Sequence, residues 1–219
     1  MKIDIHRHAI NNDASIEVVR NLFHSQTGEI ENHKLYSVGL HPWHVNEDTL
    51  QNDVNKVREI ANHPQIIAIG EAGLDKKVDV PYEIQLIAFK HQIAIARQVN
   101  KPMIIHCVKA YNEVLVLNIE ANLPRPWIIH WFNSSEEIAL QLIEKGFYLS
   151  YGTMLFREES KAFKLFTKLP LERIFLETDD TGHGLDEIYQ KAASILDIPE
   201  DLLESQIMRN FTECFKIEL

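Results

Sequence analysis

The feature that most constrains the fold is a series of short apolar runs rich in β-branched residues, each followed by a longer stretch with helical periodicity. Seven of these runs predict strands, at Lys2–His6, Tyr36–Leu40, Ile66–Gly70, Pro102–His106, Trp127–His130, Phe147–Ser150 and Ile174–Glu177. Helices are expected over residues 48–62, 80–99, 110–121, 135–145, 158–168, 186–196 and 200–215. Because strands that alternate with helices are joined by right-handed crossovers in a parallel sheet, the pattern predicts an α/β protein.

Residues 9–34 interrupt this alternation. Within them, Ile16–Phe23 has the composition of either a strand or a helix. An eight-stranded barrel needs one strand more than the seven above, so we assign this segment as strand 2, with the first crossover helix lost or reduced to a turn. We therefore expect a compact (β/α)8 TIM-type barrel that forms a single domain over residues 1–219.

The composition argues against several classes of protein. It is ordinary for a globular chain, with 45% hydrophobic and 25% charged residues, and no apolar run reaches the roughly 18 residues that a membrane span needs. The N-terminal residues lack the pattern of a secretory signal. Cys107 and Cys214 form no close-spaced metal or redox motif and suit a reducing compartment. We expect a cytoplasmic protein with no membrane partner, and no obligate protein partner is evident.

The net charge bears on possible substrates. With 22 basic and 32 acidic side chains the formal charge is −10, which argues against broad electrostatic capture of nucleic acid. A bound metal ion reverses the local field, so a local phosphate site remains compatible with this charge.

Candidate metal ligands follow the predicted strands. His6 and His8 form an H-x-H pair at the end of the first strand, although 11 histidines in the chain supply about half such a pair by chance. Four further imidazole or carboxylate residues each follow a different apolar run: Glu71, His106, His130 and Asp179. Because all carboxyl-terminal strand ends of a parallel barrel open on one rim, we expect the six side chains to converge there.

The ligand types indicate the kind of metal site. Imidazoles and carboxylates without thiolates suit zinc, manganese, nickel or magnesium in an open catalytic site better than a closed structural zinc site. Six ligands exceed what one tetrahedral ion requires, whereas two adjacent divalent ions would use them all. Such a pair activates water and holds the oxygens of a phosphoester.

With these motifs the chain resembles the TatD-like metal-dependent hydrolases, relatives of the amidohydrolase barrels. Gln85, Phe89 and Gln92 fit the family's helix pattern, and Asn210, Phe211 and Phe215 fit its C-terminal one. The remaining motifs that carry the resemblance are Asp4-Ile5-His6-Arg7-His8, Val38-Gly39-Leu40-His41-Pro42, Gly70-Glu71-Ala72-Gly73-Leu74-Asp75, Lys101-Pro102-Met103-Ile104-Ile105-His106, Ile129-His130-Trp131-Phe132 and Leu176-Glu177-Thr178-Asp179.

The resemblance implies a dinuclear site. His6, His8 and Asp179 would hold one ion, and His106 and His130 the other, with Glu71 between or beside them. Asp179 and Glu71 would be the catalytic carboxylates, and Asp179 would orient the attacking water and accept its proton.

His41 has two interpretations. It resembles the family's substrate or phosphate contact, and it can equally be a histidine bonded to loop backbone. Trp43 and Trp131 can stack on nucleic-acid bases, but we favour packing for both, and Trp127 is expected in the core.

The sequence departs from the family at two places. Asp180 and Thr181 stand where relatives carry Ser-Pro, and Cys107, Val108 and Lys109 stand where relatives carry Thr-Arg-Asp after the histidine of His106, so an arginine and an aspartate are missing. Lys109 can replace the missing arginine as a phosphate contact, or it can be a solvated lysine at a helix start. These changes leave the ligands intact and put the substrate in doubt.

These residues are compatible with three functions. The first is a phosphodiesterase, specifically a deoxyribonuclease of TatD type, which uses two divalent ions (Zn, Mn, Mg or Ni) and metal-activated water on a DNA end or a small phosphoester. The second is an amide or ester hydrolase on the same metal site. The third, a non-catalytic metal-binding barrel, is disfavoured because clustered ligands at an open site are costly without use.

Overall fold

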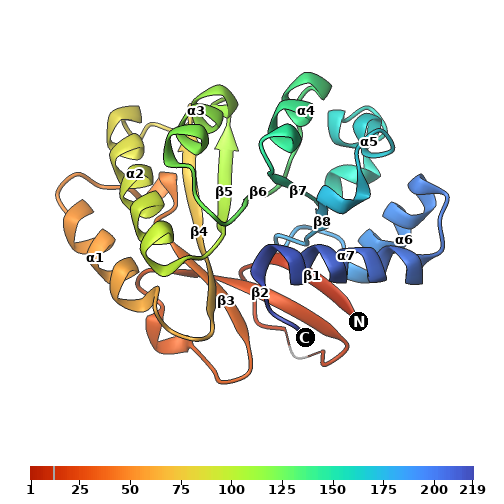
Figure 1. The fold of residues 1–219 in the computed structure, drawn as a ribbon, viewed down its shortest axis with the longest axis horizontal. Coiled ribbons are helices and arrows are strands. Elements are labelled where there is room, and N and C mark those ends of the chain that lie inside the picture. Colours follow the sequence, from red (N-terminus) through yellow and green to blue (C-terminus); the bar gives the residue numbers. More distant parts are fainter. Residues whose placement is uncertain (12) are drawn as a thin grey trace. The chain divides into compact units, whose positions relative to one another are not determined.

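The structure, a computed structural model, describes residues 1–11 and 13–219 and contains one sheet whose eight strands follow the order of the chain, β1 to β8 (Figure 1). All strand pairs with a defined register are parallel. The strands are β1 (Lys2–Arg7), β2 (Ile16–Phe23), β3 (Leu35–Gly39), β4 (Ile66–Asp75), β5 (Met103–Val108), β6 (Trp127–Ile129), β7 (Tyr148–Tyr151) and β8 (Ile174–Leu176).

Seven α-helices follow the strands of this described part of the chain. They are α1 (Leu50–Ile60), α2 (Tyr82–Val99), α3 (Tyr111–Ala121), α4 (Glu136–Glu144), α5 (Lys161–Phe166), α6 (Leu185–Leu196) and α7 (Glu200–Phe215). Four short 3-10 turns are η1 (Thr27–Glu29), η2 (Pro42–His44), η3 (Thr153–Phe156) and η4 (Leu171–Arg173). None of the helices among these residues is both long and apolar enough to cross a bilayer.

The sequence-based element order agrees with the structure. Ile16–Phe23 is a strand, as assigned, and its backbone pairs with β1 from Lys2↔Ile16 onward. Residues 8–11 and 13–15, the described part of the β1–β2 connection, contain no helix, as expected for a lost first crossover helix.

Among several predicted ends that differ from the structure, that of β4 differs in a way that bears on the site. β4 ends at Asp75 rather than at Gly70, so Glu71 lies inside the strand and not after it. The segment from Gly70 to Asp75 has two glycines and two acids, a composition typical of loops. The structure explains Gly73, whose φ is +147° and where a Cβ atom would collide with the carbonyl oxygen of His106. Only glycine allows β4 and β5 to approach so closely here.

The chain divides into two compact units, which are described separately below. Residues 21–128 form one of them, and residues 1–20 with 129–219 form the other. That a single domain spans residues 1–219 therefore stays a prediction.

The unit of residues 21–128 is built on β3, β4 and β5. All ten residues of β4 are buried, as is typical of a parallel strand covered on both faces. α2 packs on β4, α1 on β3 and α3 on β5 (Figure 1). Trp127 is fully buried, which confirms its expected place in the core.

In the unit of residues 1–20 and 129–219, β1 is tied to the segment after β8. The Asp4 carboxylate accepts hydrogen bonds from the Thr178 backbone N–H (3.0 Å) and from its hydroxyl (2.6 Å). Burial raises the pKa of Asp4 to about 7, although both hydrogen bonds act in the opposite direction. α7 lies against β1 and β8. Ser135 caps α4 by accepting from the Ile138 N–H at 3.4 Å.

Candidate metal centre

In the unit of residues 21–128, the register of β4 and β5 determines where the ligands lie. His106 on β5 is directly opposite Gly73 on β4. Alternate residues of a strand face the same side, so Glu71 and Asp75 flank Gly73 on the face that His106 shares. The His106 ring reaches both carboxylates: Nδ1 lies 2.9 Å from Glu71 Oε1, and Nε2 lies 3.0 Å from Asp75 Oδ2. All three side chains are buried.

The hydrogen bonds assign the tautomer of His106. Asp75 accepts from Trp43 Nε1 (2.6 Å) and from the Lys77 backbone N–H (2.8 Å) as well as from His106. Burial alone would raise the pKa of Asp75, but these hydrogen bonds hold it below the ordinary value. An ionised Asp75 favours a proton on His106 Nε2, so in a neutral ring the Nδ1 lone pair faces Glu71.

His41 meets the same group from the end of β3. It precedes η2, and its Nδ1 accepts from the Trp43 backbone N–H at 3.1 Å, so the proton of a neutral ring lies on Nε2. Nε2 is 3.1 Å from Glu71 Oε1 and 3.2 Å from His106 Nδ1. His41 therefore presents an N–H donor, not a lone pair, to Glu71 and His106.

Glu71 lies at a register shift in β4, between Ile69 and Ala72. Such irregularities redirect side chains near functional sites. Its backbone N–H donates to Asn21 Oδ1 at 2.7 Å, and that oxygen also accepts from the Ser37 hydroxyl at 3.0 Å. Asn21, buried on β2, thus fixes the position of Glu71 in the strand.

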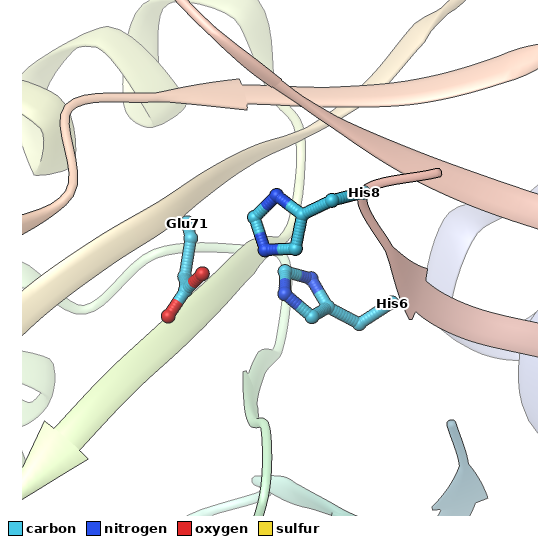
Figure 2. A group of neighbouring side chains, drawn as sticks. All are labelled: His6, His8 and Glu71. Carbon is cyan, nitrogen blue, oxygen red and sulfur yellow. The ribbon is translucent and has the colours of Figure 1, made fainter. Parts of the chain in front are cut away.

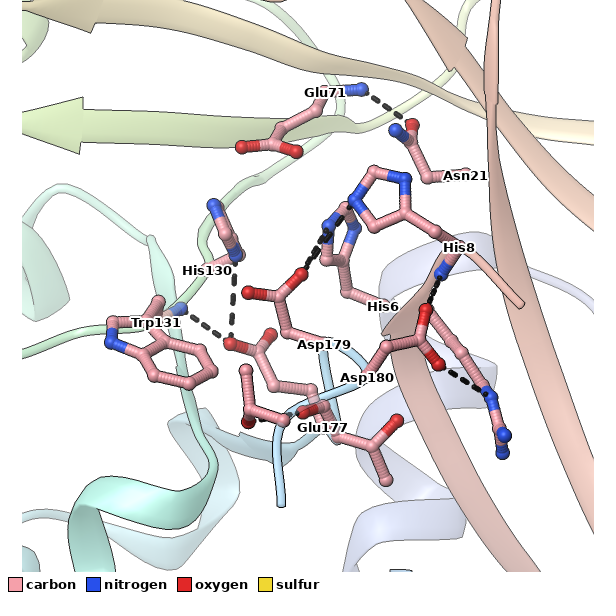
Figure 3. A network of polar contacts seen from close by, with 12 residues as sticks. His6, His8, Asn21, Glu71, His130, Trp131, Glu177, Asp179 and Asp180 are labelled. Carbon is pink, nitrogen blue, oxygen red and sulfur yellow. Dashed lines mark hydrogen bonds and ion pairs between the residues drawn. The ribbon is translucent and has the colours of Figure 1, made fainter. Parts of the chain in front are cut away.

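In the unit of residues 1–20 and 129–219, the imidazoles of His6 and His8 project from the end of β1 (Figure 2), with ring centroids 5.2 Å apart and planes at 85°. Nε2 of each ring is 3.6 Å from Asp179 Oδ1 (Figure 3). Asp179 follows β8, and its backbone N–H donates to the His6 carbonyl at 3.1 Å, which keeps the two segments in register.

His130, directly after β6, joins this second group. Its ring centroid lies 4.5 Å from that of His6, and ligand atoms of His6, His130 and Asp179 all lie within 4.8 Å of one another. His130 Nδ1 is 3.6 Å from Oε1 of Glu177, a fully buried carboxylate that also accepts from the Trp131 N–H at 2.5 Å (Figure 3). The other oxygen of Glu177 has no hydrogen bond among the described residues.

Both groups fit a divalent cation. Two bonds of about 2.1 Å at a tetrahedral angle place ligand atoms roughly 3.4 Å apart, close to the 3.6 Å separations around Asp179. In the other unit, the lone pairs of His106 Nδ1 and Glu71 Oε1 face each other at 2.9 Å, and a cation bound to both atoms would relieve their repulsion. Imidazole nitrogen and carboxylate oxygen are suitable donors for zinc, manganese or magnesium.

The six predicted ligands are thus distributed over the two units. His6, His8, His130 and Asp179 belong to one unit, while Glu71 and His106 belong to the other, together with His41. The prediction that His106 and His130 share an ion joins both units and stays a prediction, as do the roles of Glu71 and His41.

The contacts of three residues in the candidate site are not among the predictions from sequence. Asn21 has no recognisable signal, because it lies in a segment whose composition fits either a strand or a helix. Asp75 does have one, since Glu71, Gly73 and Asp75 alternate along a strand and therefore share a face. Trp43 is more than half exposed and donates through its indole to Asp75, so it is neither a packed core residue nor only a stacking platform.

Metal-dependent hydrolases are among the proteins to which this chain is similar. The family model described as TatD related DNase matches residues 7–216. An uncharacterized metal-dependent hydrolase of Bacillus subtilis, YabD, is 35% identical over 146 residues, which cover 65% of this chain and 57% of that protein. YcfH of Escherichia coli K12, also an uncharacterized metal-dependent hydrolase, is 33% identical over 155 residues, or 69% of this chain and 57% of that protein. The matches thus span less than two thirds of these relatives.

Solved structures show the same fold. The TatD homologue YJJV of Escherichia coli K12 superposes with a TM-score of 0.86 at 19% identity and covers 99% of this chain and 98% of its own. A TatD family hydrolase from Entamoeba histolytica superposes with a TM-score of 0.81 at 15% identity, over 98% and 97% of the two chains. These similarities confirm the predicted (β/α)8 TIM-type barrel. Together with the match of the family model over residues 7–216, they lead to one conclusion: the chain belongs to the TatD-related DNase family.

Proposed function

We propose that the protein is a divalent-metal-dependent hydrolase that cleaves phosphodiester bonds, as a deoxyribonuclease acting on DNA ends or on small phosphoesters. The observation that carries the proposal is the pair of imidazole–carboxylate groups, each with spacings that suit a cation. Divalent ions, when bound, lower the pKa of water and stabilise the charge that develops on phosphoester oxygens.

The proposed ligands and the proposed general base are different parts of this site. His6, His8 and Asp179 would hold one ion, with His130 beside them, and Glu71 and His106 would ligate a second. Asp179 is the proposed general base: its Oδ1 faces the two imidazoles, so Oδ2 is the oxygen proposed to take the proton of the attacking water.

His41 supports a phosphoryl substrate. Its Nε2–H points towards Glu71 and His106, and a donor in that position can bond a phosphate oxygen that has reached the ion. We therefore retain His41 as a substrate contact rather than a ligand, because the Trp43 N–H occupies its other nitrogen. The cytoplasm is the proposed location, since Cys107 and Cys214 are buried thiols.

Metal content and substrate range test the proposal. Protein purified without added ions, then exposed to Zn²⁺ or Mn²⁺, should bind about two equivalents. Bis(p-nitrophenyl) phosphate and a DNA oligonucleotide should be hydrolysed faster than p-nitrophenyl acetate. Faster acyl hydrolysis would instead favour the amide or ester hydrolase, and binding of no ion would refute the metal site.

Asp179→Asn tests the general base. Because the amide cannot accept a proton, turnover should fall roughly 100-fold or more while the protein stays folded. Asp201→Asn, a change in an exposed residue of α7, is the matched control and should keep full turnover. Unchanged turnover in Asp179→Asn would exclude Asp179 as the base.

A further inference from the structure

The backbone of His8 needs support from outside the sheet. β1 ends at Arg7, so ladder hydrogen bonds do not extend to His8. Its carbonyl oxygen accepts from Arg20 Nε at 2.9 Å, and its N–H donates to Asp180 Oδ2 at 2.8 Å (Figure 3). The same Asp180 oxygen accepts from the Ala9 N–H at 2.7 Å. Both polar backbone groups of His8 are therefore held by side chains.

The other oxygen of Asp180 faces a cation. Oδ1 accepts from Arg7 Nε at 3.0 Å, and both side chains are only partly exposed. One carboxylate thus bonds three donors from consecutive residues, Arg7, His8 and Ala9. A side chain with a single hydroxyl oxygen would be shorter and would offer fewer acceptor sites.

The backbone at Asp179 and Asp180 directs the two side chains. Both residues are left-handed, with φ of 45° and 54°, a conformation that aspartate tolerates better than most residues. In Figure 3 the Asp179 carboxylate points towards His6 and His8, whereas that of Asp180 points towards the backbone of His8. One turn therefore supplies a ligand and, next to it, a support for another ligand.

We propose that Asp180 is a positioning residue for the metal site: it fixes the backbone of His8 so that the imidazole faces Asp179 before an ion binds. The inference rests on the proposed metal-dependent function. Partners that orient a ligand in this way contribute roughly 10- to 100-fold to metal affinity. Asp180 acts through hydrogen-bond acceptance, so its charge is secondary.

The test measures Zn²⁺ affinity by competition with a chromogenic chelator, for the full chain and three variants. Asp180→Ala should weaken one of about two equivalents roughly 10- to 100-fold. Asp180→Asn keeps an oxygen that can accept from His8 and Ala9, so it should restore most of the affinity. Glu187→Ala is the control, because Glu187 also accepts a loop N–H, from Gly184 at 2.8 Å, but lies outside the ligand group. It should bind as the parent does.

Each outcome decides one point. Equal affinity in Asp180→Ala and the parent would overturn the inference and leave the proposed function standing. If Asp180→Asn binds Zn²⁺ as weakly as Asp180→Ala does, the charge of Asp180 and not its positioning of the backbone matters. That result would also overturn the inference. A parent that binds no ion would defeat the proposed function and the inference together. Thermal unfolding of the metal-free protein shows whether Asp180→Ala folds. If it does not, Asp180→Ser takes its place, and an affinity equal to that of the parent would likewise overturn the inference.

Discussion

At the residue scale, the candidate ligand His106 carries a carboxylate partner on the ring nitrogen that does not face Glu71. Asp75 accepts from His106 Nε2 at 3.0 Å. Such a partner fixes the tautomer and turns the lone pair of the other nitrogen towards the ion. The sequence therefore predicts which residue is the ligand. Which of its two ring nitrogens binds the ion depends on a neighbouring side chain, and that neighbour is known only from the fold.

Asp75→Asn tests this assignment. An amide cannot accept from Lys77, Trp43 and His106 in one orientation, so either the His106 tautomer or the loop contact is lost. We expect one of about two Zn²⁺ equivalents to bind roughly 10- to 100-fold more weakly, measured by chelator competition. Trp43→Phe removes one donor to Asp75 and keeps the bond to His106, so its loss should be smaller. Equal losses in both variants would contradict the role assigned to Asp75.

At the scale of elements, α2 does more than cover β4. Gln85 and Gln92, two helical turns apart, each use their amide to bond both groups of one residue at a strand end. Gln85 bonds the N–H (2.8 Å) and carbonyl (3.0 Å) of Asp75, and Gln92 bonds those of Leu40 at the same two distances. The side-chain amides thereby replace a neighbouring strand where β4 and β3 end, directly beside Asp75 and His41.

Gln92→Leu should therefore destabilise the protein strongly, although the two side chains are similar in size. It leaves the buried N–H and C=O of Leu40 without their partners, and each loss costs about 1 to 3 kcal/mol in free energy of unfolding. Urea denaturation of the metal-free protein measures the effect. Lys90→Leu, at an exposed position of α2, should stay within about 0.5 kcal/mol of the parent. A Gln92→Leu variant as stable as this control would exclude the supporting role.

Sequence predicted the elements better than their ends. β2 followed from the need for an eighth strand, and the strand order followed from strand–helix alternation. The end of β4 was wrong because Gly70 and Gly73 are typical of loops, and their actual cause, the close approach of Ile104 and His106 backbone, lies in another strand. The contact of Asn21 with Glu71 could not be predicted either, since it depends on how the strands pack, whereas Asp75 follows from the alternation with Glu71 once β4 is extended.

At the scale of the whole molecule, the net charge of −10 limits how the proposed DNA substrate could be bound. A chain that binds DNA through a basic surface releases many counterions, and its affinity falls steeply with salt. The proposed site would instead recognise a phosphate through bound ions and the N–H of His41. Of the nearby cations, Arg7 bonds Asp180 and Arg20 bonds the His8 carbonyl, so both already serve the protein. We therefore expect a DNA substrate to be bound through one phosphate at the metal site and not through an extended basic surface.

This predicts a weak salt dependence. With one protein donor on the phosphate, log Kd for a single-stranded oligonucleotide should change with log salt by a slope of about 1 or less. Fluorescence anisotropy with metal-loaded Asp179→Asn, between low and moderate KCl, measures that slope without cleavage. Lys109→Gln tests the remaining candidate: the exposed Lys109, if it contacts phosphate, should lower the slope by about 0.7 when replaced. A slope of several units would mean that a basic surface, rather than the metal site, captures the DNA.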